Sequence, residues 1–387
     1  SASEADARLE LEFVRGYARD CHANNLFYIK ARKDTPEAVS ASGSSGARAS
    51  AERTLGGSIP AEELAEDTEI VYCVAGLGVV YDKRRNAQRF FRGHTDDVKC
   101  LTVSRAKDLC ASGQLGREPT AIVWDPYTCA SLKVLTHPRG TRGVAAVGFD
   151  RDAKTLATVG MDNNHTIFVW DWRSGACAHQ LRGHADVPPK VYGLVFDWVG
   201  EDPEAFLTYG VNHVKFWKKT DAERVTSSGK QSKQSREYVE ESGKFGPVCK
   251  KHAVVSAVYL PSGRVLTGTP EGSIAVWSAA QRRITRLVRA HAPGPSVTRV
   301  DGPPTHHGVR CLRLRADGET LLSAGADGHV IAWDVKNGDL KESSVISATP
   351  VRSADGRSGA PPVFVGLDCS PNAGNTFVAG TDGSDAW

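Results

Sequence analysis

The sequence lacks most of the features that identify a metal site, a redox protein or a membrane protein. Its nine cysteines include no Cys-x-x-Cys pair, which argues against zinc ribbons and thioredoxin-like redox sites. It has no apolar run of about 18 residues, so no membrane span is expected, and its first residues have no apolar signal-peptide core. The odd, scattered set of cysteines predicts reduced thiols in a cytoplasmic protein.

Motifs that carry chemistry are also missing. The segment SSGKQS (227–232) contains Gly-Lys but lacks the upstream glycine of a phosphate-binding loop. No G-x-S-x-G elbow lies on a credible turn. The adjacent pair His306 and His307 would point to opposite faces of a strand, and GADGH (325–329) has too few carboxylates for a calcium loop. We therefore predict no catalytic, cofactor-binding or metal-binding residue, and no enzyme activity.

The small net charge argues against nucleic acid as a partner of the whole molecule. The chain has 387 residues and a net charge of only +3, which is too weak to predict nucleic-acid binding by the whole molecule. One methionine and 38 glycines are typical of a turn-rich β protein, and a hydrophobic fraction of 40% suffices for a large core.

What the sequence does contain is a repeat marked by tryptophan. Each of six tryptophans ends a short, mostly apolar run, such as AIVW, IFVW or VIAW, at intervals of 46 to 60 residues. Asp follows three of them directly, at Asp125, Asp171 and Asp334. A period near 45 residues indicates a repeat architecture. The six are Trp124, Trp170, Trp217, Trp277, Trp333 and Trp387.

Each repeat unit reads as one small antiparallel sheet. In the unit of Trp170, strands are expected at 142–150, 155–160, 166–172 and 175–184, with turn residues between them. A single sheet of this kind cannot bury both faces, but sheets stacked around a ring cover one another. The six tryptophan units (93–387) and a tryptophan-free first unit (9–92) therefore predict an all-β propeller of about seven blades.

Gly-His before the first strand and Trp-Asp in the third form the WD40 signature. We expect the histidine to reach a Ser or Thr of the second strand, an Asp to orient it, and the tryptophan to cover both. Such a buried, satisfied network makes a blade rigid and needs no substrate. Its members are expected to be His94, Ser112 and Trp124; Thr158, Asp162 and Trp170; His184, Thr208 and Trp217; Trp277; and Ser323, Asp327 and Trp333.

The tryptophan-free segment 9–92 carries a family resemblance. The pieces LEFVRGY-x-x-RDC-x-x-NNL, EIVY, GVVYD and QRFFRGHTDDVKCL closely resemble the HELP motif of the echinoderm microtubule-associated protein-like family. That family consists of microtubule-associated scaffolds with two fused propellers. The resemblance therefore implies that this chain is the N-terminal half of a tandem propeller, with the second propeller absent from it.

The chain departs from that family plan in particular segments. Residues 1–8 are expected to form a disordered tail, and the Ala-, Ser- and Gly-rich stretch 31–69 a flexible insertion. Trp387 ends the sequence at the third strand of the last blade. LELEF (9–13) would either supply a closing strand or pack against a second propeller, and the sequence leaves both alternatives open.

The strongest local charge lies after Trp217. Residues 215–251 contain ten Lys or Arg and five acidic residues, which gives +5, and 221–250 are expected to form a mobile basic loop. A second basic run is QRRITRLVRAH (281–291). Because tubulin is acidic, both are candidate contact surfaces for it. The candidate residues are Lys215, Lys218, Lys219, Arg224, Lys230, Lys233, Arg236, Arg282, Arg283 and Arg286.

The resemblance favours a non-catalytic scaffold that binds tubulin or microtubules, with other cytoskeletal or axonemal proteins as further partners and neither nucleic acid nor membrane. Its expected location is the cytoplasm and cytoskeleton, including the ciliary axoneme. A generic WD40 adaptor that does not contact tubulin is the alternative. A propeller enzyme would need a convergent acid–base set on one rim.

Overall fold

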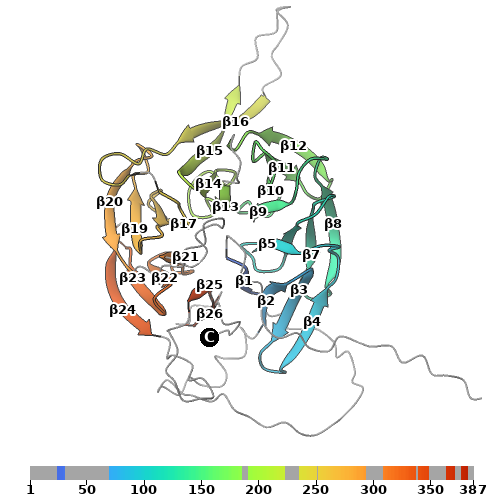
Figure 1. Cartoon of the computed structure of the whole chain (residues 1–387), viewed down its shortest axis with the longest axis horizontal. Helices are drawn as coiled ribbons and strands as arrows, with labels where there is room; N and C mark the ends of the chain where they lie inside the picture. The colour runs from blue at the N-terminus through green and yellow to red at the C-terminus, as the bar shows by residue number, and fades with distance from the viewer. Residues whose placement is uncertain are drawn as a thin grey trace, which may run out of the picture.

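The protein is described by a computed structural model that covers residues 24–30, 69–184, 191–222, 235–250, 252–292, 308–336, 339–347, 363–370 and 376–381. These residues form 26 strands and no helix. The strands make small antiparallel sheets arranged radially around one axis, with the first strand of each sheet nearest the centre (Figure 1). The molecule is therefore an all-β propeller.

Blades 1 to 3 each have four strands in sequence order from the axis outward. Blade 1 contains Leu26–Tyr28 (β1), Glu69–Val74 (β2), Leu77–Asp82 (β3) and Ala87–Phe91 (β4). Blade 2 contains Val98–Val103 (β5), Cys110–Gln114 (β6), Thr120–Asp125 (β7) and Ala130–Thr136 (β8). Blade 3 contains Val144–Phe149 (β9), Thr155–Gly160 (β10), Ile167–Asp171 (β11) and Ala176–Leu181 (β12).

Blades 4 to 6 follow the same order, and a smaller sheet comes after them. Blade 4 contains Val191–Phe196 (β13), Phe206–Gly210 (β14), His213–Ala222 (β15) and Ser235–Ser242 (β16). Blade 5 contains Ser256–Tyr259 (β17), Val265–Gly268 (β18), Ser273–Trp277 (β19) and Ile284–Arg289 (β20). Blade 6 contains Val309–Leu314 (β21), Thr320–Gly325 (β22), His329–Asp334 (β23) and Lys341–Ser347 (β24), and the last sheet contains Phe364–Cys369 (β25) and Phe377–Thr381 (β26).

The expected count of about seven blades needs a correction. Within the described residues, six sheets have four strands, and the seventh has only two and lies between blade 6 and blade 1. The ring thus has six complete blades. The inner strand of blade 1 is β1, from the segment NLFYIK. The tail 1–8, LELEF (9–13), the predicted insertion up to residue 68 and Trp387 lie outside the described residues, whereas Glu69 already begins β2.

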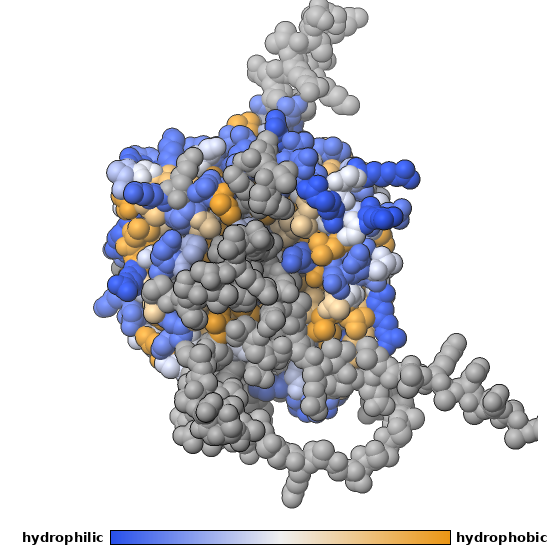
Figure 2. Space-filling model, in the orientation of Figure 1, coloured by the Kyte–Doolittle hydropathy of each residue, from blue (hydrophilic) through white to orange (hydrophobic). Residues whose placement is uncertain are grey.

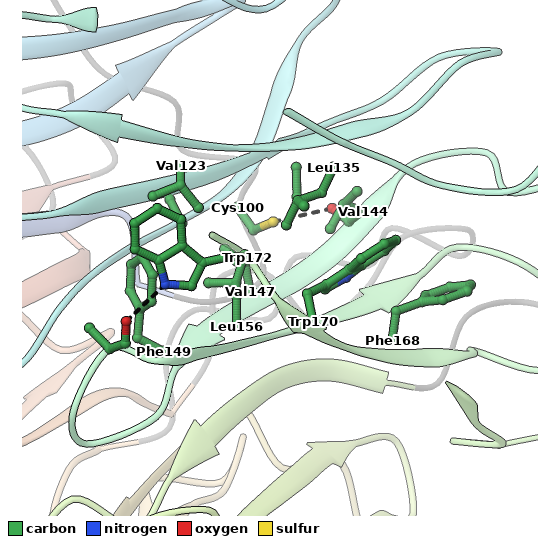
Figure 3. Close-up of a cluster of buried hydrophobic side chains, with 13 residues drawn as sticks. Cys100, Val123, Leu135, Val144, Val147, Phe149, Leu156, Phe168, Trp170 and Trp172 are labelled. Carbon is green, nitrogen blue, oxygen red and sulfur yellow. Dashed lines mark hydrogen bonds between the residues drawn. The ribbon is translucent and has the colours of Figure 1, made fainter. Parts of the chain in front are cut away.

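The core consists of apolar clusters that each join two neighbouring sheets. Between blades 2 and 3, Val123 and Leu135 of blade 2 pack with Phe149, Trp170 and Trp172 of blade 3 (Figure 3). Similar clusters join the other neighbours all round the ring. Each blade therefore buries its apolar faces by packing against the two neighbouring blades, as the repeat pattern predicts.

A β-bulge recurs at the third strand of blades 2, 3, 5 and 6 and is missing from blades 1 and 4. The register between the third and fourth strands shifts immediately before Trp124, Trp170, Trp277 and Trp333. In blade 4 the ladder from Lys215 to Ala222 runs without a shift. With strands of 10 and 8 residues, this ladder projects outward as the β15–β16 hairpin (Figure 1).

This hairpin corrects the expectation of a basic loop at 221–250. Residues 235–242 form β16 and pair in register with the extended β15. The physical reason is local, because SREYVEES supplies Tyr238 and Val239, which suit a strand, and Tyr238 lies against Phe206 with 5.3 Å between ring centroids. Residues 223–234 lie outside the described part of the chain.

Polar contacts between the two ends of the chain close the ring. The buried Asp368 of β25 accepts a hydrogen bond from the backbone N–H of Tyr28 at 2.8 Å and forms an ion pair with Lys107 of blade 2. Its other oxygen lies 3.7 Å from Nε of Arg313 in blade 6. In addition, the N–H of Leu367 donates to the side chain of Asn24 at 2.8 Å. Three sheets and a blade 2 loop therefore meet at one carboxylate.

Candidate functional site

In five blades, the indole N–H of the third-strand tryptophan donates to a hydroxyl of the second strand. These tryptophans are all buried. The N–H···O distances are 3.0 Å for Trp124–Ser112 and Trp170–Thr158, 3.1 Å for Trp217–Thr208, and 2.9 Å for Trp277–Thr267 and Trp333–Ser323. Thr267 is the one hydroxyl that sequence reasoning did not single out, although it occupies the same position in its strand as the others.

Blade 6 contains the complete network. His291, which follows β20, has Nε2 2.8 Å from Ser323 Oγ and Nδ1 2.9 Å from Asp327 Oδ1. Burial raises the pKa of Asp327, but hydrogen bonds from His291 and from the N–H groups of Ala292 and His329 outweigh it and lower that pKa to about 2. The carboxylate therefore stays charged and fixes the ring of His291.

Blade 2 orients its network histidine without a carboxylate. His94 Nε2 lies 2.6 Å from Ser112 Oγ, and Gln114 Oε1 lies 2.9 Å from His94 Nδ1. Gln114 thus takes the place of the missing aspartate. The signal was present in the sequence, because Gln114 alternates with Ser112 along the same strand and so faces the same side.

Three histidines of the networks, His137, His213 and His291, were not singled out from the sequence. His137 Nε2 lies 2.8 Å from Thr158 Oγ1 in blade 3. Asp162 does not bond to this ring; it holds the following turn by accepting from Asn164 N–H at 2.8 Å and from the Thr166 hydroxyl at 3.1 Å.

In blade 4, the expected bond between His184 and Thr208 is wrong. Thr208 Oγ1 lies 2.8 Å from Nε2 of His213, and His184 instead packs edge-on against His213 with ring centroids 5.3 Å apart. His213 is the first residue of β15, directly after the turn from β14, so its ring lies next to the Thr208 hydroxyl.

The network side chains are buried in the blades, which indicates a structural role. Burial lowers the pKa of His94 and His137, the latter to about 4. The pKa of His213 falls to about 3, through burial and then through the nearby His184, Lys215 and His165. Imidazoles held neutral and enclosed in this way are poorly placed to exchange protons with a substrate.

A conservative replacement of Trp170 tests this role. We expect Trp170→Phe to lower the free energy of unfolding by about 1–3 kcal/mol, because Thr158 loses the indole donor while most ring burial remains. Urea unfolding of Trp170→Phe, Thr158→Val and the double variant measures the coupling. Strictly additive losses would show that the indole and the hydroxyl do not act as a unit.

The candidate cations of blade 4 lie on the β15–β16 hairpin, largely in ion pairs. Lys215 Nζ lies 2.6 Å from Glu240 Oε2, and Glu204 holds Lys219 at 2.5 Å and Arg236 at 3.1 Å. Lys218 is exposed and has no acidic partner among the described residues. Arg224, Lys230 and Lys233 lie outside the described residues.

The candidate cations of blade 5 lie beside this hairpin. Arg282 is 3.8 Å from Glu241 and lies over the ring of Phe216 at 4.6 Å. Arg283 forms a backbone bridge to residue 244 of blade 4, and Arg286 is 3.5 Å from Asp339. The two basic runs therefore meet at the rim of neighbouring blades. On the face that Figure 2 shows, hydrophilic residues cover much of the rim, with apolar patches between them.

The described residues contain no group of three or more His, Cys, Asp or Glu side chains that could hold a metal ion. Nor does any helix in the described part of the chain have the length and apolarity to cross a membrane. The geometry thus presents buried structural networks and a charged rim.

Comparison with known families assigns the propeller. Residues 87–366, 280 of the 387, match the family model described as the echinoderm microtubule-associated protein first beta-propeller. The chain belongs to the echinoderm microtubule-associated protein family. The match begins in β4 and ends in β25, so most of blade 1 precedes it.

Relatives of this family propeller come from vertebrates and sea urchins. It is 28% identical over 349 residues to human echinoderm microtubule-associated protein-like 2, an alignment that covers 87% of this chain and 43% of that protein. It is 27% identical over 294 residues to the 77 kDa echinoderm microtubule-associated protein of Strongylocentrotus purpuratus, covering 74% and 38%. The chain thus spans less than half the length of these relatives.

Among solved structures, the family propeller is similar to that entitled "Structure of U3-55K". The TM-score is 0.58 at 17% identity, and the superposition covers 81% of this chain and 85% of the other. At this identity the likeness shows the propeller fold alone.

Proposed function

We propose that this echinoderm microtubule-associated protein family propeller is a non-catalytic scaffold that binds tubulin or microtubules through its surface. The observation that carries the proposal is the match of the propeller itself to a family of microtubule-associated proteins. Relatives from human and sea urchin are named for the same association. The buried networks offer no catalytic set, which agrees with a binding role.

The rim of blades 4 and 5 is the surface we propose for the contact. Among its cations, Lys218 is exposed and makes no ion pair within the described residues, so its charge is available to an acidic partner. Lys219 and Arg236 share Glu204 and therefore contribute less to the field outside the molecule. Arg224, Lys230 and Lys233, in the segment beyond β15, remain candidates.

Co-sedimentation with taxol-stabilised microtubules tests the proposal. We expect the protein to pellet with microtubules at about 50 mM salt and to dissociate progressively as salt rises to about 300 mM, because screening shortens the reach of surface charge. Failure to pellet at low salt would contradict microtubule binding and favour the alternative, an adaptor that does not contact tubulin. A pull-down in which tubulin is absent would point the same way.

Charge removal locates the surface. We expect the triple variant Lys218→Ala, Lys230→Ala and Lys233→Ala to weaken microtubule binding by about threefold or more, since attraction to an acidic surface falls with each charge removed. Lys219 is left intact because its pair with Glu204 supports the hairpin. The matched control is Lys83→Ala, Lys154→Ala and Lys341→Ala, which removes equal charge from exposed positions on blades 1, 3 and 6. Equal weakening by both variants would refute a localised site.

From this proposal we expect the protein to be located in the cytoplasm, on the cytoskeleton. Association with the ciliary axoneme, other cytoskeletal partners, a second propeller in the same polypeptide, and the absence of nucleic-acid and membrane partners stay predictions. Immunofluorescence of the protein in a ciliated cell, with and without microtubule depolymerisation, would test the location.

A further inference from the structure

The axis of the propeller contains a cavity of about 370 Å³. Its walls are the inner strands, from β5 round to β25, which surround the axis in Figure 1. The loops that follow these strands also contribute, including Arg105 and Lys107 after β5 and Arg315 after β21. The cavity therefore lies at the end of the ring where the inner strands finish. Its volume is at the lower end of that found for pockets that hold ligands.

One side of this cavity is strongly positive. Five of its lining residues are cationic, and they come from blade 2 and blade 6: Arg105, Lys107, Arg310, Arg313 and Arg315. Among the described lining residues the one carboxylate is Asp368, which forms an ion pair with Lys107. In the described lining, five cationic side chains thus accompany one carboxylate. A cleft with low-dielectric walls concentrates the field of such a set and attracts anions.

The other side is aromatic. Trp198 of blade 4 is half-buried there, and the rings of Phe149, Phe196 and Tyr259 lie behind it, buried in the cores between blades. The indole N–H of Trp198 donates to the carbonyl oxygen of Phe149 at 2.9 Å, which fixes the ring in place. This wall therefore offers the apolar face of one ring, that of Trp198.

Tyr209 completes the wall from the second strand of blade 4. Its ring passes over Gly193 of β13, where a Cβ atom would lie only 2.1 Å from the ring, so a glycine is required there. Burial is the main cause that raises the pKa of Tyr209 to about 12, so the phenol is neutral and does not offset the positive side.

We propose that this central cavity binds an acidic segment of a partner protein, in which a carboxylate side chain sits next to an apolar one. The carboxylate faces Arg105 and Arg315, and the apolar side chain packs on the half-buried ring of Trp198. A small polyanion would place charge against that aromatic wall, whereas a peptide carries both kinds of side chain. This site goes beyond the microtubule proposal, because it lies on the axis and not on the rim of blades 4 and 5.

Titration with the fluorescein-labelled peptide Glu-Glu-Phe-Glu-Glu tests the site by fluorescence anisotropy. We expect saturable binding at about 50 mM salt that weakens as salt rises. Glu-Glu-Ser-Glu-Glu is expected to bind several-fold more weakly because it cannot cover the aromatic wall, and Lys-Lys-Phe-Lys-Lys is expected not to bind. No microtubules are needed, so failure here and failure of co-sedimentation are separate results.

A matched pair of variants locates the peptide. Arg105 and Arg117 are both exposed, both in blade 2, and neither has a side-chain partner among the described residues. Arg105 lines the cavity, whereas Arg117 lies in the β6–β7 connection at the other end of the sheet. We expect Arg105→Glu to weaken peptide binding about tenfold and Arg117→Glu to leave it within about twofold, with unchanged melting curves for both.

Three results would overturn the proposal. The first is no binding of the peptide by the wild-type protein at about 1 mM. The second is equal weakening by Arg105→Glu and Arg117→Glu, which would indicate general surface attraction. The third is binding of inositol hexakisphosphate without binding of the peptide, which would assign the cavity to a small polyanion.

Discussion

Lowering the pH from about 6.5 to about 4 is expected to reduce the free energy of unfolding by roughly 6 kcal/mol. The cause is the pair of buried histidines His137 and His213, which hold the tryptophan networks of blades 3 and 4. Because folded proteins are stable by about 5–15 kcal/mol, a loss of this size brings the protein close to unfolding at mildly acidic pH.

The sign follows from the direction of the pKa shifts. The folded-state pKa of His137 is lowered from 6.5 to about 4 and that of His213 to about 3, in both cases mainly by burial. Between pH 6.5 and these values the unfolded chain binds more protons than the folded one, so stability falls as pH falls. At 1.36 kcal/mol per pKa unit, each histidine contributes about 3 kcal/mol by pH 4.

Buried aspartates act in the opposite direction to the histidines or below pH 4. Burial is the main cause that raises the pKa of Asp150 and Asp197, so protonation of these groups offsets part of the loss. The pKa of Asp327 is lowered from 3.8 to about 2, so the stability that it contributes is fully present above pH 4 and is lost below that.

Urea unfolding at several pH values between about 7.5 and 4.5 measures the effect. In the variant His213→Gln, stability at neutral pH should be lower, but its dependence on pH should be shallower, because one of the two groups no longer titrates. A flat stability profile for the wild-type protein from pH 7 to 5 would contradict neutral, buried histidines.

The blade plan was predictable because it depends on short-range pattern. A tryptophan at the end of each third strand and a hydroxyl in the second, such as Ser112 and Trp124, predict both the strand order and their contact. Alternation along one strand even suggests that Gln114 shares a face with Ser112. These relations are local, and the backbone of a small antiparallel sheet fixes them.

The choice of histidine was not predictable in the same way. His184 is at the position that the WD40 signature predicts for the network histidine. The hydrogen bond to Thr208 nevertheless comes from His213, which is five positions away in the sequence and on the neighbouring strand. Both side chains are imidazoles that can form this hydrogen bond. Only the three-dimensional path of the chain determines which one lies next to Thr208.

Contacts across the ring were the least predictable. Asp368 and Tyr28 are 340 residues apart, and nothing in either local sequence signals their hydrogen bond. The cavity on the axis has the same origin, because Arg105 and Arg313 belong to blades that no sequence pattern places side by side. The ring closes at the sheet that has only two described strands. The polar contacts of Asp368 therefore help to hold the two ends of the chain together, and the repeat pattern does not predict this role.

The second large effect concerns this closure. We expect Asp368→Ala to lower the free energy of unfolding by about 3–5 kcal/mol, because removing one partner leaves buried charges without compensation. The side chains of Lys107 and Arg313 are only 15% and 25% exposed, so water cannot fully replace the carboxylate. The N–H of Tyr28 would lose its acceptor as well.

Two comparisons separate charge from hydrogen bonding at Asp368. Asp368→Asn keeps an acceptor for Tyr28 and removes the charge, so we expect roughly half of the loss. Asp152→Ala breaks an exposed pair with Lys154 at 3.3 Å and should cost less than about 1 kcal/mol. If Asp368→Ala and Asp152→Ala were equally mild in urea unfolding, the contacts at Asp368 would not close the ring, and packing of β25 and β26 against blades 6 and 1 would have to hold it alone.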